Sequence, residues 1–168
     1  MAPWAPAKTN LIEESLQSSY LVRYYLLMLA SGKVKKCFWH QLIAPGYGLV
    51  NNLNGQIIKR DAYYCFKHLV VSLTGGKTKK LIREKNLFCL VIEKDDTIIE
   101  AIWSSDKKAS FKSNPDQKIY DMRGKIIDTK NSPVLNITGE VVYIEKLKTG
   151  YQEFNFKETS KVLAGFPN

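Results

Sequence analysis

The spacing of the apolar residues changes at Gly75-Gly76, and this change constrains the fold more than any other feature of the sequence. Before this point, apolar residues recur every three or four positions, which is typical of helices. After it, short apolar runs alternate with turn residues, which is typical of strands. Because helices and strands repeat every 3.6 and 2 residues, one element cannot satisfy both patterns. The sequence therefore predicts a mixed α/β segment followed by an all-β segment.

The first predicted helix spans residues 11–31. Asn10 and Glu13 have the spacing of a capping box at its start, and Gly32 follows its end in the position where a left-handed residue is common. The apolar residues of this helix fall on two faces: Leu16, Tyr20, Tyr24 and Leu27 on one, and Val22, Leu26 and Leu29 on the other. We therefore expect the helix to be buried over much of its surface.

One strand and a second helix are predicted in the rest of the first half. Residues 34–43 form a short apolar run, and a glycine-rich loop follows at residues 44–48. Alternation places two sets of side chains on opposite faces of this strand: Cys37, Trp39 and Gln41 on one, and Phe38 and His40 on the other. Asn54-Gly55 indicates the tight turn of a small hairpin. The second helix is predicted over residues 61–73.

The second half is predicted to be a small antiparallel β-sandwich over residues 87–148. Short apolar runs recur there at regular intervals with turn residues between them. The expected strands are 88–93, 97–103, 108–112, 118–122, 125–128, 134–137 and 141–145. We interpret residues 77–86 as a basic linker, and residues 149–168 as a tail to which the pattern assigns no structure.

The chain is basic, with 25 lysines and arginines against 16 acidic residues and a net charge of +9. The excess is spread over both halves, apart from one dense group: Lys77, Lys79, Lys80, Arg83 and Lys85. Such a group can meet phosphate or an anionic surface. Aromatic residues that would stack on bases are not interleaved with it. We therefore interpret the group as a solvated segment and expect no nucleic-acid partner.

The three cysteines are Cys37, Cys65 and Cys89, each in an apolar run. They form neither a CxxC pair nor a Cys/His cluster, so no metal site is predicted. Free buried thiols favour a reducing, cytoplasmic compartment. The longest apolar stretch, residues 20–30, is too short to cross a bilayer, and residues 1–10 lack the apolar core of a signal peptide. No glycine motif for phosphate binding occurs, and no cofactor is predicted.

A single strand between two helices cannot form a sheet by itself. Parallel strands are buried on both faces and have neighbours along both edges. Residues 34–43 have no parallel partner in the sequence, so the strand either pairs with the second half or has neighbours outside this chain. The loop that follows it lies where active-site loops occur in α/β barrels and open α/β sheets.

Several of these segments also carry a family resemblance. RYYLLMLASG ends the first helix, FWH and APGYGL mark the strand and its loop, and DAYY begins the second helix. In the second half, the turn Asp121-Met122-Arg123-Gly124 and the run Ser132-Pro133-Val134-Leu135 belong to the same pattern. Together these motifs resemble the last part of a clan A glycoside hydrolase, as in xylosidase-like and cellulase-like (β/α)8 enzymes. The resemblance covers about residues 10 to 145.

The resemblance implies an incomplete barrel at residues 1–76 and an accessory β-sandwich at residues 87–148. In such enzymes two glutamates, at the ends of barrel strands four and seven, act as acid/base and nucleophile. The carboxylates of residues 1–76 are Glu13, Glu14 and Asp61, and each fits the start of a helix rather than the end of a strand. The resemblance therefore implies no catalytic residue here. We expect the chain to be a C-terminal piece that is inactive alone.

Four candidate sugar-binding residues follow from the resemblance. Trp39 matches the tryptophan that ends barrel strand eight and forms the floor of a sugar subsite, although a core role would also fit an indole. His40 and Gln41 follow it and offer hydrogen bonds to sugar hydroxyls. Tyr47 is placed to reach the cleft, or else its flanking glycines serve only to form a tight loop.

Two functions remain open from the sequence. One is a piece of a glycoside hydrolase whose partner in the intact protein is a carbohydrate. The other is a non-enzymatic β-sandwich module that binds glycans, or an anionic partner through the basic group at residues 77–85. If barrel strands are missing, the first helix exposes apolar surface, and self-association is expected.

Overall fold

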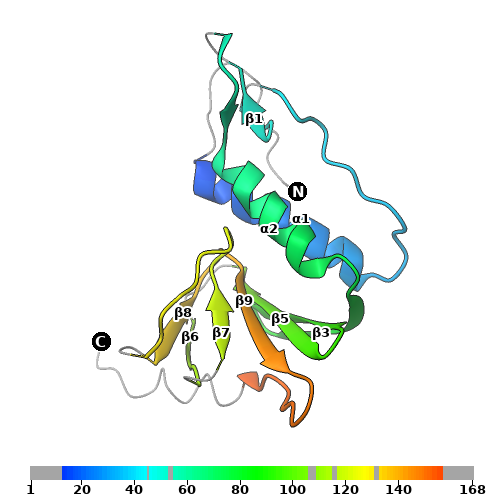
Figure 1. Ribbon diagram of the computed structural model, residues 1–168, viewed down its shortest axis with the longest axis vertical. Helices are drawn as coiled ribbons and strands as arrows, with labels where there is room; N and C mark the ends of the chain where they lie inside the picture. Colours follow the sequence, from blue (N-terminus) through cyan, green and yellow to red (C-terminus); the bar gives the residue numbers. More distant parts are fainter. Residues whose placement is uncertain are drawn as a thin grey trace.

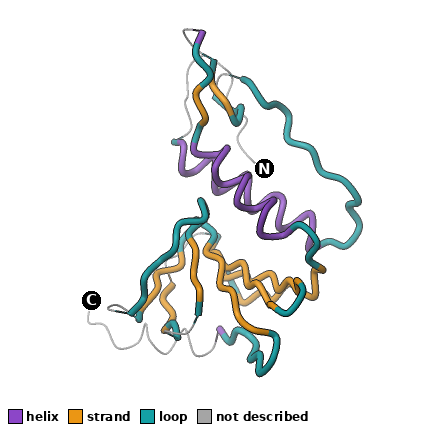
Figure 2. The backbone as a smooth tube through the Cα atoms, in the orientation of Figure 1, coloured by secondary structure: helices purple, strands orange, loops and turns teal. Residues whose placement is uncertain are grey.

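The computed structural model describes residues 13–44, 46–52, 55–105, 109–114, 117–130 and 133–156. In this part of the chain, two helices cover one face of a five-stranded antiparallel sheet, and a two-stranded sheet packs on the other face (Figure 1). A long loop and a small hairpin extend from the helices away from these sheets (Figure 2). The fold is therefore mixed α/β, as the change of periodicity predicts.

Helix α1 spans Glu14–Ala30, and Glu13 precedes it as the N-cap residue. The predicted cap at Asn10 lies outside the described residues. Gly32 adopts a φ of +64° after the helix, as expected for a residue that ends a helix. The prediction of burial over much of the surface holds for one side of α1 and is wrong for the other. Its apolar core residues are Leu21, Val22, Tyr25 and Leu26, whereas Leu16, Tyr24 and Leu27 are exposed.

The predicted strand at residues 34–43 is not formed. The chain there is extended and keeps the predicted alternation, since Cys37 and Trp39 pack against the core while Phe38 is 81% exposed. A strand needs a neighbour to accept its backbone hydrogen bonds. Within the described residues, this segment makes one isolated bridge, from Ile43 to Val50. The sequence supplied a strand-like pattern, but the fold supplied no partner strand.

The predicted hairpin and second helix are both present. Strands β1 (Val50–Asn51) and β2 (Ile58–Lys59) pair in antiparallel fashion on either side of the predicted turn. Helix α2 spans Asp61–Leu73, the predicted range, and packs along α1. Gly76 lies so close to strand β4 that a Cβ on it would come within 2.7 Å of Ile92 Cγ2. The chain can enter the sheet here because this residue has no side chain.

The interpretation of residues 77–86 as a linker is wrong. Strand β3 (Lys77–Glu84) forms there and pairs with β4 (Leu87–Lys94) along its whole length. Its inner residues Leu81 and Ile82 are partly buried against the two cores, one on each face of the sheet. The exposed lysines therefore belong to an edge strand. Charged residues on such a strand oppose pairing with other chains.

The remaining strands match the predicted pattern with one exception. Strands β5 (Thr97–Ser104), β9 (Val142–Leu147) and β7 (Lys118–Tyr120) complete the sheet in the order β3-β4-β5-β9-β7, and β6 (Ala109–Lys112) pairs with β8 (Val134–Ile137). Asp95-Asp96 forms the predicted hairpin turn, with Asp95 at a φ of +50°. The predicted strand at 125–128 is reduced to a single bridge between Tyr120 and Ile126.

Each face of the five-stranded sheet has its own core. Alternate residues of β4, β5 and β9 face the helices: Leu90, Ile92, Ile99, Ala101, Trp103 and Tyr143. The residues between them face β6, β8 and the chain after β9. That chain, the C-terminal segment at residues 149–156, folds back across the sheet and buries Phe156. We call residues 77–156 the β domain.

Candidate functional site

All four predicted sugar-binding residues lie on one loop, and three of them contact one another. We call it the Trp39 loop, residues 39–44 and 46–48. Trp39 Nε1 donates a hydrogen bond to the carbonyl oxygen of Tyr47 at 3.1 Å. The rings of His40 and Tyr47 stack with their centroids 6.5 Å apart. Gln41 is exposed and takes no part in these contacts. The side chains of Trp39, His40 and Tyr47 thus lie close together on the loop.

A buried arginine holds the end of the Trp39 loop. Arg60 is 8% exposed, and its Nη1 donates to the carbonyl oxygen of Gly48 at 3.1 Å while its Nε donates to Glu14 Oε1 at 2.7 Å. Glu14 Oε2 also accepts the backbone N–H of Asp61 at the start of α2. This network ties the loop to the starts of both helices. The sequence analysis missed it, because Arg60 and Glu14 are 46 residues apart and form no motif.

The carboxylates of the first half are committed to structural contacts. Asp61 accepts two hydrogen bonds from Arg123, at 2.6 and 2.9 Å, and Glu14 is paired with Arg60. Glu13 is exposed at the N-cap of α1. A retaining glycosidase needs two carboxyl groups about 5 Å apart, one as proton donor and one as nucleophile. The described residues around the Trp39 loop offer no such pair.

The Asp61 ion pair also joins the helices to the β domain. Arg123, in the turn after β7, reaches Asp61 on one side and Glu140 at 3.3 Å on the other. Burial lowers the pKa of Arg123, but the two carboxylates outweigh it and raise the pKa. Arg123 belongs to the Asp-x-x-Gly turn that the sequence analysis singled out. The turn therefore anchors the start of α2 to the β domain.

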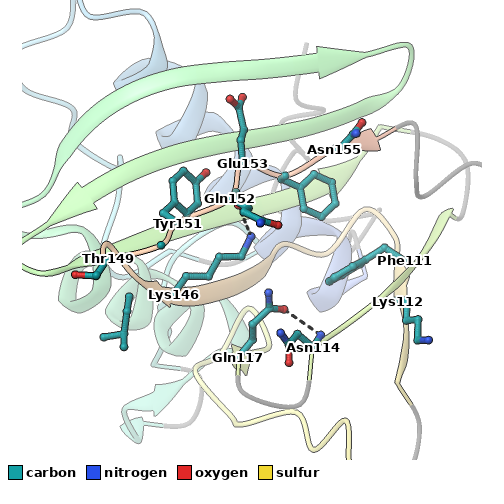
Figure 3. A pocket seen from close by; sticks show the side chains of 13 residues that line it. Phe111, Lys112, Asn114, Gln117, Lys146, Thr149, Tyr151, Gln152, Glu153 and Asn155 are labelled. Atoms are coloured by element: carbon teal, nitrogen blue, oxygen red, sulfur yellow. Dashed lines mark hydrogen bonds between the residues drawn. The ribbon is translucent and has the colours of Figure 1, made fainter.

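A second polar site lies in the β domain, on the sheet face away from the helices. A cavity of about 610 Å³ opens between the end of β9, the C-terminal segment and the residues Phe111, Lys112, Asn114 and Gln117 (Figure 3). We call it the sheet cavity. Lys146 extends along it, with Gln117 and Asn114 on one side and Tyr151 and Gln152 on the other (Figure 3).

A fully buried glutamate lies beneath the sheet cavity. Glu100 Oε1 accepts hydrogen bonds from Tyr151 Oη at 2.8 Å and from the backbone N–H of Phe154 at 3.1 Å. Its Oε2 is paired with Lys146 Nζ at 2.7 Å. Burial raises the pKa of Tyr151, and the Glu100 carboxylate raises it further. A charged residue within the apolar run of β5 was the available signal for this group, and the sequence analysis did not use it.

Two of the five residues of the dense basic group pair with neighbouring acids. Lys79 pairs with Glu93 at 3.0 Å, and Lys80 pairs with Glu153 of the C-terminal segment. These pairs hold β3 to β4 and to the C-terminal segment. They leave less positive charge for an external anion than the sequence suggests.

The three cysteines are free, and Cys65 and Cys89 are buried as predicted, with Cys37 half-buried. Burial raises the pKa of Cys65 to about 12, so its thiol is protonated and unreactive at neutral pH. Neither helix in the described part of the chain is long and apolar enough to cross a membrane.

Comparison with known proteins gives one informative match. No family model matches the chain, and no curated protein matches it significantly. A solved structure of a family 39 glycoside hydrolase from the gut symbiont Bacteroides cellulosilyticus WH2 is similar, with a TM-score of 0.66 and 18% sequence identity. The chain has the fold of part of that enzyme. The similarity covers 82% of this chain and 31% of the other, so the chain spans about a third of the length of that hydrolase.

Proposed function

We propose that this chain is the C-terminal part of a (β/α)8 glycoside hydrolase and that the intact protein hydrolyses O-glycosyl bonds. The observation that carries the proposal is the fold similarity to part of a family 39 glycoside hydrolase over 82% of the chain. The sequence motifs support the same family independently of that similarity. Residues 34–43 support it too, because they have the alternation of a strand but make one isolated bridge, from Ile43 to Val50, among the described residues.

In this proposal the Trp39 loop forms one wall of a sugar subsite. An indole face can cover the apolar C–H face of a pyranose, and burial of that face from water favours binding. His40, Gln41 and Tyr47 contribute hydrogen bonds to sugar hydroxyls. Arg60 acts indirectly, because it fixes the loop through the carbonyl of Gly48. The proton donor and the nucleophile come from the part of the barrel that this chain does not contain.

The first test is an activity assay with aryl glycosides, such as a nitrophenyl xyloside. We expect no turnover by the purified 168-residue chain, because hydrolysis needs both a proton donor and a nucleophile or base. Robust turnover that Glu13→Gln, Glu14→Gln or Asp61→Asn abolishes would contradict the proposal.

The second test joins the chain to the barrel segment encoded upstream. We expect turnover to appear, and Trp39→Ala in that protein to weaken sugar binding by about 1–3 kcal/mol, taking stacking of bases on aromatic side chains as a guide. Lys36→Ala is the control, because Lys36 is an exposed charged residue on the same segment. If the two variants weaken sugar binding equally, Trp39 is not part of the sugar subsite.

The alternative of an anionic partner at residues 77–85 is less well supported. Lys79 and Lys80 already have acidic partners, and the group lies along an edge strand rather than on a flexible linker. The lysines oppose pairing of this edge strand with other chains, and this role explains their presence without any ligand.

A further inference from the structure

We propose that the sheet cavity is a second ligand site and that it takes a short, uncharged oligosaccharide. It lies on the opposite face of the five-stranded sheet from the core against which Trp39 packs, so it is separate from the Trp39 loop. Its volume of about 610 Å³ falls within the range of about 300–1,000 Å³ that is usual for small-molecule sites.

The floor of the sheet cavity is already fixed without a ligand. The buried Glu100 is satisfied by Tyr151, by the backbone of Phe154 and by Lys146. Lys146 Nζ also lies 5.4 Å from the centre of the Tyr151 ring and donates to the carbonyl oxygen of Gln152 at 3.4 Å. These contacts hold the Lys146 stem and the aromatic rings in place. A ligand therefore meets a prearranged surface and does not bear the cost of ordering it.

The walls combine amides with aromatic rings. Four carboxamide side chains line the cavity: Asn114, Gln117, Gln152 and Asn155. A carboxamide both donates and accepts hydrogen bonds, as a sugar hydroxyl does, so the two groups are complementary. Tyr151 and Phe154 are only half-buried, and they offer apolar surface for the C–H face of a sugar ring. Amides beside aromatic rings match a ligand that carries both hydroxyl groups and apolar ring faces.

The charge of the site argues for a neutral ligand. Lys146 is paired with Glu100, and Glu153 is paired with Lys80, so both charges have partners before a ligand arrives. A phosphate or sulfate would compete with Glu100 for Lys146 and would place a second negative charge near a buried carboxylate. A wholly apolar ligand would cover the carboxamide NH2 groups of Gln117 and Gln152 without accepting their hydrogen bonds, which is costly. An uncharged, hydroxyl-rich ligand avoids both penalties.

The test is a titration of the full chain, ¹⁵N-labelled, with xylotetraose and with cellotetraose, followed by backbone amide NMR shifts. We expect saturable shifts confined to residues 111–117 and 146–155 with at least one of the two sugars. Gln117→Ala combined with Gln152→Ala should weaken that binding about tenfold, because two hydrogen-bonding side chains are lost at about 0.7 kcal/mol each. Gln56→Ala, an exposed glutamine in the hairpin, is the matched control and should change nothing.

Separate outcomes distinguish this proposal from the function proposed above. Trp39→Ala should leave the shifts at the sheet cavity unchanged, and shifts limited to the Trp39 loop would assign binding to the barrel subsite and overturn the second site. Sodium phosphate in place of sugar should give no saturable shift at Lys146. Saturation by phosphate together with no response to either sugar would show an anion site and would also overturn the proposal.

Discussion

His68 lies at the contact between helix α2 and the β domain. Its ring meets Tyr143 edge-on at 4.9 Å between centroids, and Tyr120 lies 5.8 Å away. Ser72 Oγ is 3.4 Å from its Nδ1. Burial lowers the pKa of His68, and the Asp121 carboxylate offsets this in part. The folded protein therefore favours the neutral imidazole.

We predict that the free energy of unfolding falls as the pH drops below about 6.5, the ordinary pKa of histidine. Above that pH the imidazole is neutral in both states and has no effect. Below it, the unfolded chain binds a proton before the folded chain does, so unfolding becomes easier until the lower folded pKa is reached. Urea unfolding at pH 7.5 and at pH 5.5 should show that the free energy of unfolding falls more between these pH values in the native sequence than in His68→Gln. Equal losses would mean that His68 is not responsible.

The buried charge pair under the sheet cavity gives a second prediction. Glu100→Gln should destabilise the protein by about 3–5 kcal/mol, because Lys146 is left without its anion in a mostly buried position. Denaturant unfolding measures the effect. Glu93→Gln is the control, since its pairs with Lys79 and Lys148 are at the surface and screened by solvent. If the charge pair is the cause, the double variant Glu100→Leu/Lys146→Leu should lose less free energy of unfolding than the sum of the losses in the two single variants.

At the scale of elements, the turn at residues 121–124 packs closely against helix α2, because Gly124 lies next to the ring of His68. Gly124 has a φ of +88°, and a Cβ on it would come within 2.5 Å of His68 Nδ1. Gly75 has a similar φ of +81° but open space around it. The two glycines therefore separate the effect of backbone strain from that of a collision.

We predict that Gly124→Ala lowers the free energy of unfolding by about 1–3 kcal/mol more than Gly75→Ala does. Both substitutions strain a left-handed backbone, and only the first also forces the His68 ring away from Tyr143. Thermal or urea unfolding of the two variants gives the difference. Losses of equal size would indicate that the turn moves freely away from α2.

Residues 34–43 show how an element depends on its surroundings. Their alternating pattern is that of a strand, and the side chains follow it, but a strand is defined by bonds to a neighbour. The opposite happens at residues 77–84. Their lysine-rich pattern suggests a linker, yet pairing with β4 makes them a strand.

At the scale of the whole molecule, several large apolar side chains are exposed. Phe38 and Leu42 on the extended segment are 81% and 56% exposed, and Leu16, Tyr24 and Leu27 line the outer side of α1. Phe38 and Leu42 lie on a segment whose Cys37 and Trp39 pack against the core. Exposed apolar side chains of this kind favour association.

We predict that the isolated chain self-associates and binds a hydrophobic dye. Sedimentation velocity over a range of concentrations and dye fluorescence measure the two effects. Phe38→Ser combined with Leu42→Ser should reduce both, whereas Lys36→Ser, a change at an exposed charged residue nearby, should not. A monomer that unfolds sharply and reversibly without dye binding would contradict the view that part of a barrel is missing.

The sequence by itself determined the elements whose signals are local. Helix α2, the hairpin turn at Asp95-Asp96 and strand β8 follow from apolar period and turn residues within about a dozen positions. The resemblance also placed Trp39, His40 and Tyr47 at one site, and the structure brings them together on one loop. Their role in sugar binding stays a prediction.

Only the tertiary structure decided the features that depend on distant partners. The Arg60–Glu14 pair, the Glu100–Lys146 pair and the return of residues 151–156 across the sheet join residues far apart in the chain. Distant partners also decide that residues 34–43 do not form the predicted strand and that residues 77–84 do form one. The local spacing of apolar residues indicates which side of a segment is apolar. It does not report which other segment will satisfy the backbone hydrogen bonds or the buried charges, and those partners determine the final structure.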